Sequence, residues 1–258
     1  MSLSGKRVVI LGGTSGIGLA TAKAAERAGA AVVIASSRRE RLDRALALLR
    51  SAEGEVVDVA DETQVRALFE RIGAFDHLVF TAGESLQLEP LGAMQVERAR
   101  GFVNVRFWGA FMAAKYGSRH IRPGGSITLT NGIAGLRPRK GWTVAASICG
   151  AMEALTRALA VELAPIRVNA VCPGTVRTEL WSGMTEAARD DVPRRRPATS
   201  GRARRRGGRP RGDLPLPHAG RLQHRPGARR RRRRRTGVRR RVYDAPLSAT
   251  ASTSILKP

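Results

Sequence analysis

The sequence has little of what stabilises a secreted or fibrous protein. Two Cys in 258 residues cannot build a disulfide framework, so we expect a reducing, cytoplasmic setting. No uninterrupted apolar run reaches the roughly 18 residues of a membrane helix, and the N-terminus lacks a signal-peptide pattern. We therefore expect no membrane partner, and we predict no metal site. Collagen, secreted knottins, porins and coiled coils are excluded.

Acidic residues are scarce in one part of the chain. Residues 1–192 include 24 basic and 19 acidic residues, whereas residues 193–258 include 22 basic and 2 acidic ones. Most of the net charge of +25 therefore falls in the last quarter of the chain. The length suits one α/β domain or two small ones. We predict a globular domain over residues 1–192 and an Arg-rich, disordered tail over residues 193–258.

Short apolar, β-branched runs alternate with amphipathic stretches through the first 180 residues. This alternation predicts a doubly wound parallel sheet in an α/β fold of three layers, with helices on both faces. The predicted strands cover residues 7–11, 31–35, 55–59, 77–80, 126–130 and 166–171. The predicted helices cover residues 18–27, 38–50, 62–72, 96–120 and 144–163.

Four Gly-rich or polar loops follow predicted strands at their carboxyl ends. They comprise residues 13–18, 81–83, 131–135 and 172–178. Ligands of open α/β sheets bind beyond the carboxyl ends of the strands. We therefore predict that this edge of the sheet is the functional face.

The first of these loops has the sequence Leu11-Gly12-Gly13-Thr14-Ser15-Gly16-Ile17-Gly18. Glycines there allow a tight turn and let a pyrophosphate approach the backbone at the N-terminus of a helix, whose partial positive charge favours an anion. Taken alone, the pattern also fits a plain Gly-rich turn. The spacing Gly12-x3-Gly16-x-Gly18 resembles the cofactor loop of the short-chain dehydrogenase/reductase family.

Further motifs match this family in order over about residues 5–190. Asp58-Val59 resembles its adenine-contacting Asp, and Thr81-Ala82-Gly83 resembles its Asn-Ala-Gly turn with Thr in place of Asn. The segment 167–174, with Thr178, resembles its sixth strand and the Pro-Gly-x3-Thr loop near the nicotinamide. The resemblance implies a Rossmann-type fold. It also implies a cofactor held by Gly12, Thr14, Ser15, Gly16, Ile17, Gly18, Ser37, Arg38, Arg39, Asp58, Val59, Ala82, Gly83, Pro173, Gly174 and Thr178.

The residues after the second predicted strand bear on the choice of cofactor. An acidic residue there binds the ribose hydroxyls of NAD, whereas Arg accommodates the 2′-phosphate of NADP. The chain has Ser36-Ser37-Arg38-Arg39 and no acid before Glu40. This favours NADP(H) over NAD(H), because guanidinium groups suit a phosphate. The alternative is a basic first turn on a solvated helix.

The resemblance also implies where a catalytic set should lie, and different residues stand there. The family uses Tyr as general acid/base, Lys four residues later, Ser after the fifth strand and Asn on the preceding long helix. The matching positions are Ala145, Cys149, Gly132 and Arg106. Losing one positioned acid/base typically costs about 10²–10⁴ in rate. The replacements argue against efficient carbonyl reduction by the usual mechanism, but not against binding of NADP(H).

The chain also offers substitutes for these residues. Asn104 is two residues away from the Asn position, and Ser147 should face away from the site because it lies about 200° around the helix from position 145. Cys149 could act as a thiolate if its pKa were lowered, or could be a small packed helix residue. Arg139 and Lys140 could reach a ligand, or could be solvated loop charges.

The arginine runs of the tail have three interpretations: a nucleic-acid-binding arm acting by counterion release, a solvated unfolded tail, or a frameshift. Codons read one base later can turn residues 225–235 into Gly-Pro-Val-Leu-Val-Val-Asp-Gly-Gly-Gly-Gly. That string resembles the last strand of the same family, so we favour a frameshift, natural or from sequencing. The last helix and strand would then be missing or disrupted, and a family-like homo-oligomer would be weakened.

Together these features predict an NAD(P)(H)-binding oxidoreductase that transfers hydride to or from an unknown carbonyl or alcohol, with the usual catalytic residues replaced. One alternative is an inactive pseudoenzyme that senses NADP(H). The other is a protein that binds nucleic acid nonspecifically through its basic tail.

Overall fold

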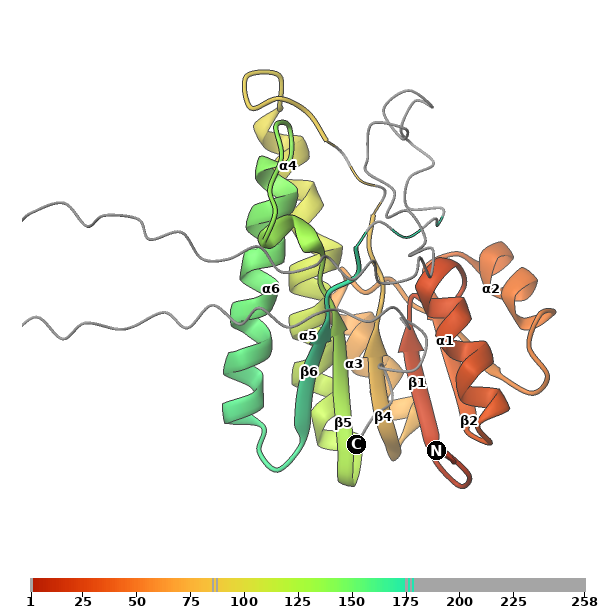
Figure 1. Cartoon of the computed structure of the whole chain (residues 1–258). Coiled ribbons are helices and arrows are strands. Elements are labelled where there is room, and N and C mark those ends of the chain that lie inside the picture. The colour runs from red at the N-terminus through yellow and green to blue at the C-terminus, as the bar shows by residue number, and fades with distance from the viewer. Residues whose placement is uncertain (1, 85, 87, 175, 177, 179–258) are drawn as a thin grey trace, which may run out of the picture. The chain divides into compact units, whose positions relative to one another are not determined.

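The computed structural model describes residues 2–84, 86, 88–174, 176 and 178 (Figure 1). These residues form a six-stranded parallel sheet in the order β3-β2-β1-β4-β5-β6, which confirms the predicted doubly wound sheet. The strands are β1 (Arg7–Leu11), β2 (Ala31–Ser36), β3 (Glu53–Val56), β4 (Phe75–Phe80), β5 (Ile121–Thr130) and β6 (Arg167–Val171). The helices are α1 (Gly16–Arg27), α2 (Arg39–Leu46), α3 (Glu62–Ile72), α4 (Val96–Val103), α5 (Ala110–Gly117) and α6 (Thr143–Glu162).

Both faces of the sheet are covered by helices (Figure 1). Successive side chains of a strand point to opposite faces, so a strand buried on both sides is apolar throughout. In β1, Val8 and Ile10 pack in a cluster with Ala25 of α1, while Val9 packs in a second cluster with Leu68 of α3. The predicted Arg-rich tail, its start at residue 193, the proposed frameshift and the last strand lie outside the described residues.

Several predicted boundaries differ from the structure. The strands β4 and β5 begin at Phe75 and Ile121, before the predicted residues 77 and 126, and further differences lie between α2 and β3. The helix predicted over 38–50 ends at Leu46, because the Glu26 carboxylate accepts hydrogen bonds from the N–H groups of Arg50 and Ser51 and holds that segment in a turn. The strand predicted over 55–59 lies at Glu53–Val56, where it pairs with β2. Asp58 then leaves the sheet, and its Oδ1 accepts from Ala60 N at 2.9 Å.

The helix predicted over residues 96–120 is confirmed in extent but is not uniform. Between α4 and α5 lies a π-helix, η1 (Asn104–Gly109), and a 3₁₀ turn, η2 (Ser118–His120), follows α5. A π-helix holds more residues per turn than an α-helix and is frequently found at functional sites. Here it carries Arg106, which stands at the expected Asn position of the catalytic set.

The helix α6 is long and apolar enough, by length and composition, to cross a membrane. Composition alone does not separate such a span from a core helix. In this fold Ile148, Met152 and Leu159 of α6 are buried in the core cluster that includes β5 and β6 residues. Packing on the sheet accounts for these buried residues of α6.

Candidate functional site

The loop between β1 and α1 is packed so tightly that its glycines cannot carry side chains. A Cβ on Gly12, whose φ is +87°, would lie 2.5 Å from the backbone N of Ala82. A Cβ on Gly18 would lie 2.1 Å from the carbonyl O of Gly12. The Thr81 hydroxyl donates to that same oxygen at 3.1 Å. The glycines therefore bring the loop against the end of β4 and fix the start of α1.

The N-terminus of α1 lies at the end of this loop. Ser15 is its N-cap residue in extended conformation, and its side chain makes no capping hydrogen bond. Thr178 lies over Gly16, because a Cβ on that glycine would be 3.1 Å from the Thr178 side chain. The structure thus brings the predicted Gly loop together with Thr178 from the loop after β6, although they are far apart in sequence.

The predicted 2′-phosphate residues lie at the carboxyl end of β2. Ser37, Arg38 and Arg39 are exposed, and Arg38 is the N-cap residue of α2. Arg39 makes a loose ion pair with Asp43 at 3.8 Å. Both arginines are therefore accessible at the edge of the sheet where the sequence predicts a ligand.

The remaining predicted cofactor residues lie at the same edge. Asp58 is exposed and Val59 is buried just after β3. Ala82 and Gly83 follow β4, while Pro173 and Gly174 follow β6. Thr14 and Ile17 are half-buried in the first loop and the first turn of α1. No cluster of three or more His, Cys, Asp or Glu side chains suited to a metal is found among the described residues.

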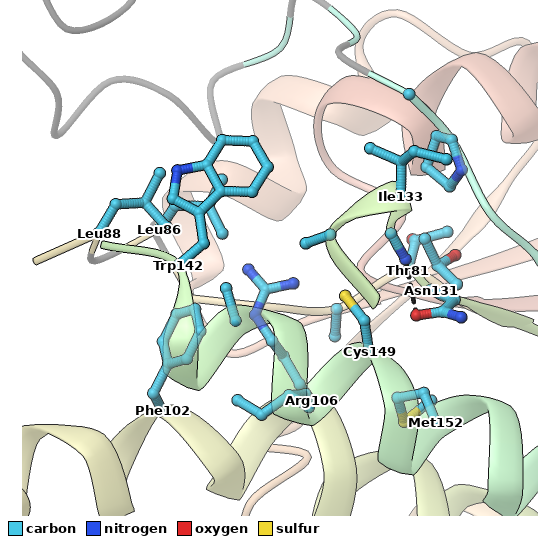
Figure 2. Close-up of a pocket in the computed structure, with 18 residues that line it drawn as sticks. Thr81, Leu86, Leu88, Phe102, Arg106, Asn131, Ile133, Trp142, Cys149 and Met152 are labelled. Atoms are coloured by element: carbon cyan, nitrogen blue, oxygen red, sulfur yellow. Dashed lines mark hydrogen bonds between the residues drawn. The ribbon is translucent and has the colours of Figure 1, made fainter. Parts of the chain in front are cut away.

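A cleft of about 870 Å³, including part of its open mouth, adjoins this edge (Figure 2). Its walls are mainly apolar, and it shares Thr81 and Ala82 with the packing around the Gly loop. The lining residues are Thr81, Ala82, Leu86, Leu88, Phe102, Arg106, Thr130, Asn131, Gly132, Ile133, Ala134, Trp142, Ala145, Ile148, Cys149, Met152, Pro173 and Gly174. All four positions of the expected catalytic set, Arg106, Gly132, Ala145 and Cys149, therefore meet in one cleft.

The residues around Cys149 are closely packed. Ala145 is 6% exposed, and a Cβ on Gly132 would lie 3.1 Å from the Cys149 Sγ. A Cβ on Gly135 would lie 3.0 Å from the Cβ of Cys149. The small residues at 132 and 135 thus leave room for the Cys149 side chain, which supports the packing interpretation of that cysteine.

The electrostatic surroundings of Cys149 do not favour a thiolate. Burial raises the pKa of the thiol, and this outweighs the opposing influence of the Gly135 N–H and of the positive charge on Arg106. A thiolate nucleophile needs a lowered pKa. Cys149 is therefore a poor candidate for the nucleophile.

The other substitutes that the sequence suggested do not line the cleft; they are Asn104, Arg139, Lys140 and Ser147. Ser147 is exposed and its Oγ donates to the carbonyl O of Thr143 at 2.9 Å, so it faces away as predicted. Asn104 is also exposed. The guanidinium of Arg139 lies 5.5 Å from the ring centroid of Trp142.

Asn131 lines the cleft, but its Nδ2 donates to Glu153 Oε1 at 3.3 Å.

Sequence reasoning missed the pairing of Arg106 with Glu84. The Arg106 Nε lies 3.4 Å from Glu84 Oε2, and Arg106 Nη2 donates to the Glu84 carbonyl O. Glu84 Oε1 accepts from Val105 N at 3.1 Å. Burial lowers the pKa of Arg106 and raises that of Glu84. Glu84, an acidic residue two positions after Ala82, was only a weak signal for this pair, because its distance along the sequence from Arg106 does not indicate a contact.

Known proteins resemble this chain over most of its described part. The SDR-like Rossmann domain family matches residues 2–194. Short-chain dehydrogenase/reductase ATR9 of Stachybotrys chlorohalonatus (strain IBT 40285) is 40% identical over 204 residues, which cover 72% of this chain and 79% of that protein.

Two solved structures bear on the cofactor. A small-chain dehydrogenase in complex with NADPH is 41% identical, with a TM-score of 0.63, over 72% of this chain and 78% of that one. The 3-ketoacyl-(acyl-carrier-protein) reductase of Brucella melitensis, complexed with NADH, is 27% identical, with a TM-score of 0.65, over 70% and 80%. From its sheet order, its Gly loop and these matches, the chain belongs to the short-chain dehydrogenase/reductase family of oxidoreductases.

Proposed function

We propose that this protein binds NADP(H) and transfers hydride to or from a carbonyl or alcohol whose body is largely apolar, without the usual Tyr and Lys. The observation that carries the proposal is the junction of the Gly loop with an apolar cleft, both of which contact Thr81 and Ala82. A dinucleotide lying on that loop would reach the cleft directly.

The Gly loop fits a dinucleotide on its own geometry. The Cβ clashes at Gly12 and Gly18 hold the backbone close to β4, and the N-terminus of α1 supplies the partial positive charge that favours a phosphate. Arg38 and Arg39 offer donors for a further phosphate at the end of β2. When bound, the nicotinamide of the cofactor supplies or accepts the hydride.

Hydride transfer to a carbonyl carbon leaves negative charge on the oxygen, which must then accept a proton. Among the described residues that line the cleft, Arg106 carries a positive charge that can face this oxygen. Ala145, at the expected Tyr position, has no hydroxyl to donate a proton. Proton transfer would therefore fall to water, and we expect turnover about 10²–10⁴-fold slower than with a positioned acid. An NADP(H)-binding pseudoenzyme is the second candidate, and the replaced positions Ala145 and Cys149 favour it.

The experiment is a titration of the full chain with NADPH, followed by turnover with a panel of apolar ketones and aldehydes. Binding with slow oxidation of NADPH supports the enzyme, and its rate should exceed that of the buffer blank. Binding without any turnover would favour the pseudoenzyme. Absence of NADPH binding would contradict both candidates.

The cofactor preference has its own expected result. Replacing both Arg38 and Arg39 by Ala should weaken NADPH binding about 10-fold and leave NADH binding unchanged, because charge-assisted hydrogen bonds to the 2′-phosphate are lost. Isothermal titration calorimetry with both cofactors measures this. The control is Arg27→Ala, which removes an exposed charge from the last turn of α1. An equal loss for NADPH and NADH would contradict the assignment.

A further inference from the structure

We propose that Arg106 makes the cleft a site for an apolar molecule that carries one carboxylate or similar oxyanion. The inference rests on the proposed function in taking the cleft as the substrate site. It adds the chemical class of the group that is recognised there, which the chain's family membership does not specify.

The guanidinium of Arg106 points into the cleft from the π-helix, near Phe102, Trp142 and Cys149 (Figure 2). Its central carbon lies 5.1 Å from the centroid of the Phe102 ring. Its Nη2 donates to the Glu84 carbonyl, and no acceptor for Nη1 is found among the described residues. One terminal nitrogen is thus left to bind a ligand.

The surrounding backbone leaves space for this guanidinium. A Cβ on Gly83 would lie 2.7 Å from Arg106 Nη1 and 2.8 Å from its central carbon. Any other residue at 83 would displace the guanidinium from its present position. Together, Gly83 and the π-helix hold the charge where it faces the cleft.

The pairing with Glu84 is incomplete. The Arg106 Nε and Glu84 Oε2 are buried atoms without a hydrogen-bond partner, although they lie 3.4 Å apart. The two side chains are only 22% and 27% exposed, so water screens them little. A planar oxyanion could approach the guanidinium with the charge-assisted hydrogen bonds that Glu84 does not make.

Two other polar groups of the cleft are already engaged. The Thr81 hydroxyl donates to the carbonyl oxygens of Leu11 or Gly12, and the Asn131 amide is held by Glu153 and Gly132. Most of the other lining side chains are apolar, Phe102 and Ile148 among them. Arg106 is therefore the group best placed to select a charged ligand over its neutral analogue.

The test compares two probes of the same shape, 2-naphthoate and 2-naphthamide, by calorimetry on the full chain without cofactor. We expect naphthoate to bind about 10- to 100-fold more tightly than naphthamide. Arg106→Gln should remove this preference, and Arg106→Lys should keep part of it. The matched control is Arg98→Gln, because Arg98 lies in the same helical region but pairs with Glu89 at 2.8 Å.

A second variant keeps the test decisive if Arg106→Gln fails to fold. Glu84→Gln removes the competing carboxylate while keeping an oxygen for the Val105 N–H, and it should strengthen naphthoate binding several-fold. Equal binding of the two probes, no binding of either, or a preference that survives in Arg106→Gln would overturn the inference. A wild-type chain that selects naphthoate but does not bind NADPH would instead contradict the proposed function alone.

Discussion

Gly18→Ala should weaken NADPH binding by on the order of 100-fold, because the hydrogen bonds from the loop and from the N-terminus of α1 to a phosphate are lost. The new Cβ would lie 2.1 Å from Gly12 O and 2.6 Å from Thr81 Oγ1, so the loop must move. The same movement displaces the N-terminus of α1 from the phosphate. We also expect a loss of about 1–3 kcal/mol in the free energy of unfolding from overpacking.

Calorimetry with NADPH and urea denaturation of the same preparation measure both effects. The control is Gly150→Ala, at a helical glycine of α6 whose Cβ would meet nothing within 4 Å. That variant should bind NADPH as wild type does and gain about 0.5–1 kcal/mol in stability. If Gly18→Ala binds NADPH normally, the loop is not the phosphate site.

The second large effect is expected at Asp76, a 4% exposed residue of β4. Its carboxylate accepts hydrogen bonds from Lys6 Nζ at 3.0 Å, Arg7 N at 2.9 Å and Arg122 Nη1 at 3.0 Å. Asp76→Ala leaves these donors without their shared acceptor. We expect a loss of about 2–3 kcal/mol, below the full value for a buried pair because Lys6 and Arg122 are about half exposed.

The effect should depend on pH. Burial raises the pKa of Asp76, but the hydrogen bonds from Arg7 N–H, Lys6 and Arg122 outweigh it, so the pKa lies below its ordinary value of 3.8. A carboxyl with a lowered pKa in the folded state stabilises the protein fully above that ordinary value and progressively less as the pH falls through the lowered one. The stability difference between wild type and Asp76→Ala should therefore shrink below about pH 4.

Urea denaturation at neutral and acidic pH measures this difference. Glu97→Gln serves as the control, because Glu97 forms an exposed pair with Arg100 at 3.2 Å. Such a pair should contribute less than about 1 kcal/mol. A stability difference for Asp76→Ala that stays constant into the acid range would show that the carboxylate is not the stabilising group.

The sheet could be predicted from the sequence because its strands are buried on both faces. Residues 8–11 and 31–35 are continuously apolar runs, which identified β1 and β2 directly. The edge strand β3 reads Glu-Gly-Glu-Val, so the apolar signal fell on the buried residues just after it, Val57 and Val59. Local hydrogen bonds, rather than hydropathy, decide where that strand ends.

The site could be predicted where short motifs resemble those of the family. The Gly loop and the expected catalytic positions 132, 145 and 149 follow from that resemblance, and the structure brings these three positions into one cleft. The Arg106–Glu84 pair could not be predicted, because it joins a π-helix to the loop after β4. Periodicity in the sequence assumes regular α-helix and so misplaces side chains there.

The parallel sheet also separates in space the residues that stabilise the fold at one edge from the residues of the candidate site at the other. Lys6, Asp76 and Arg122 lie at the amino ends of β1, β4 and β5, whereas the Gly loop and the cleft lie beyond the carboxyl ends. Distant sites without shared partners usually have additive effects on stability. Substitutions that strengthen the amino-terminal edge could therefore offset the destabilising cost of new residues in the cleft, so that its specificity can be redesigned one position at a time.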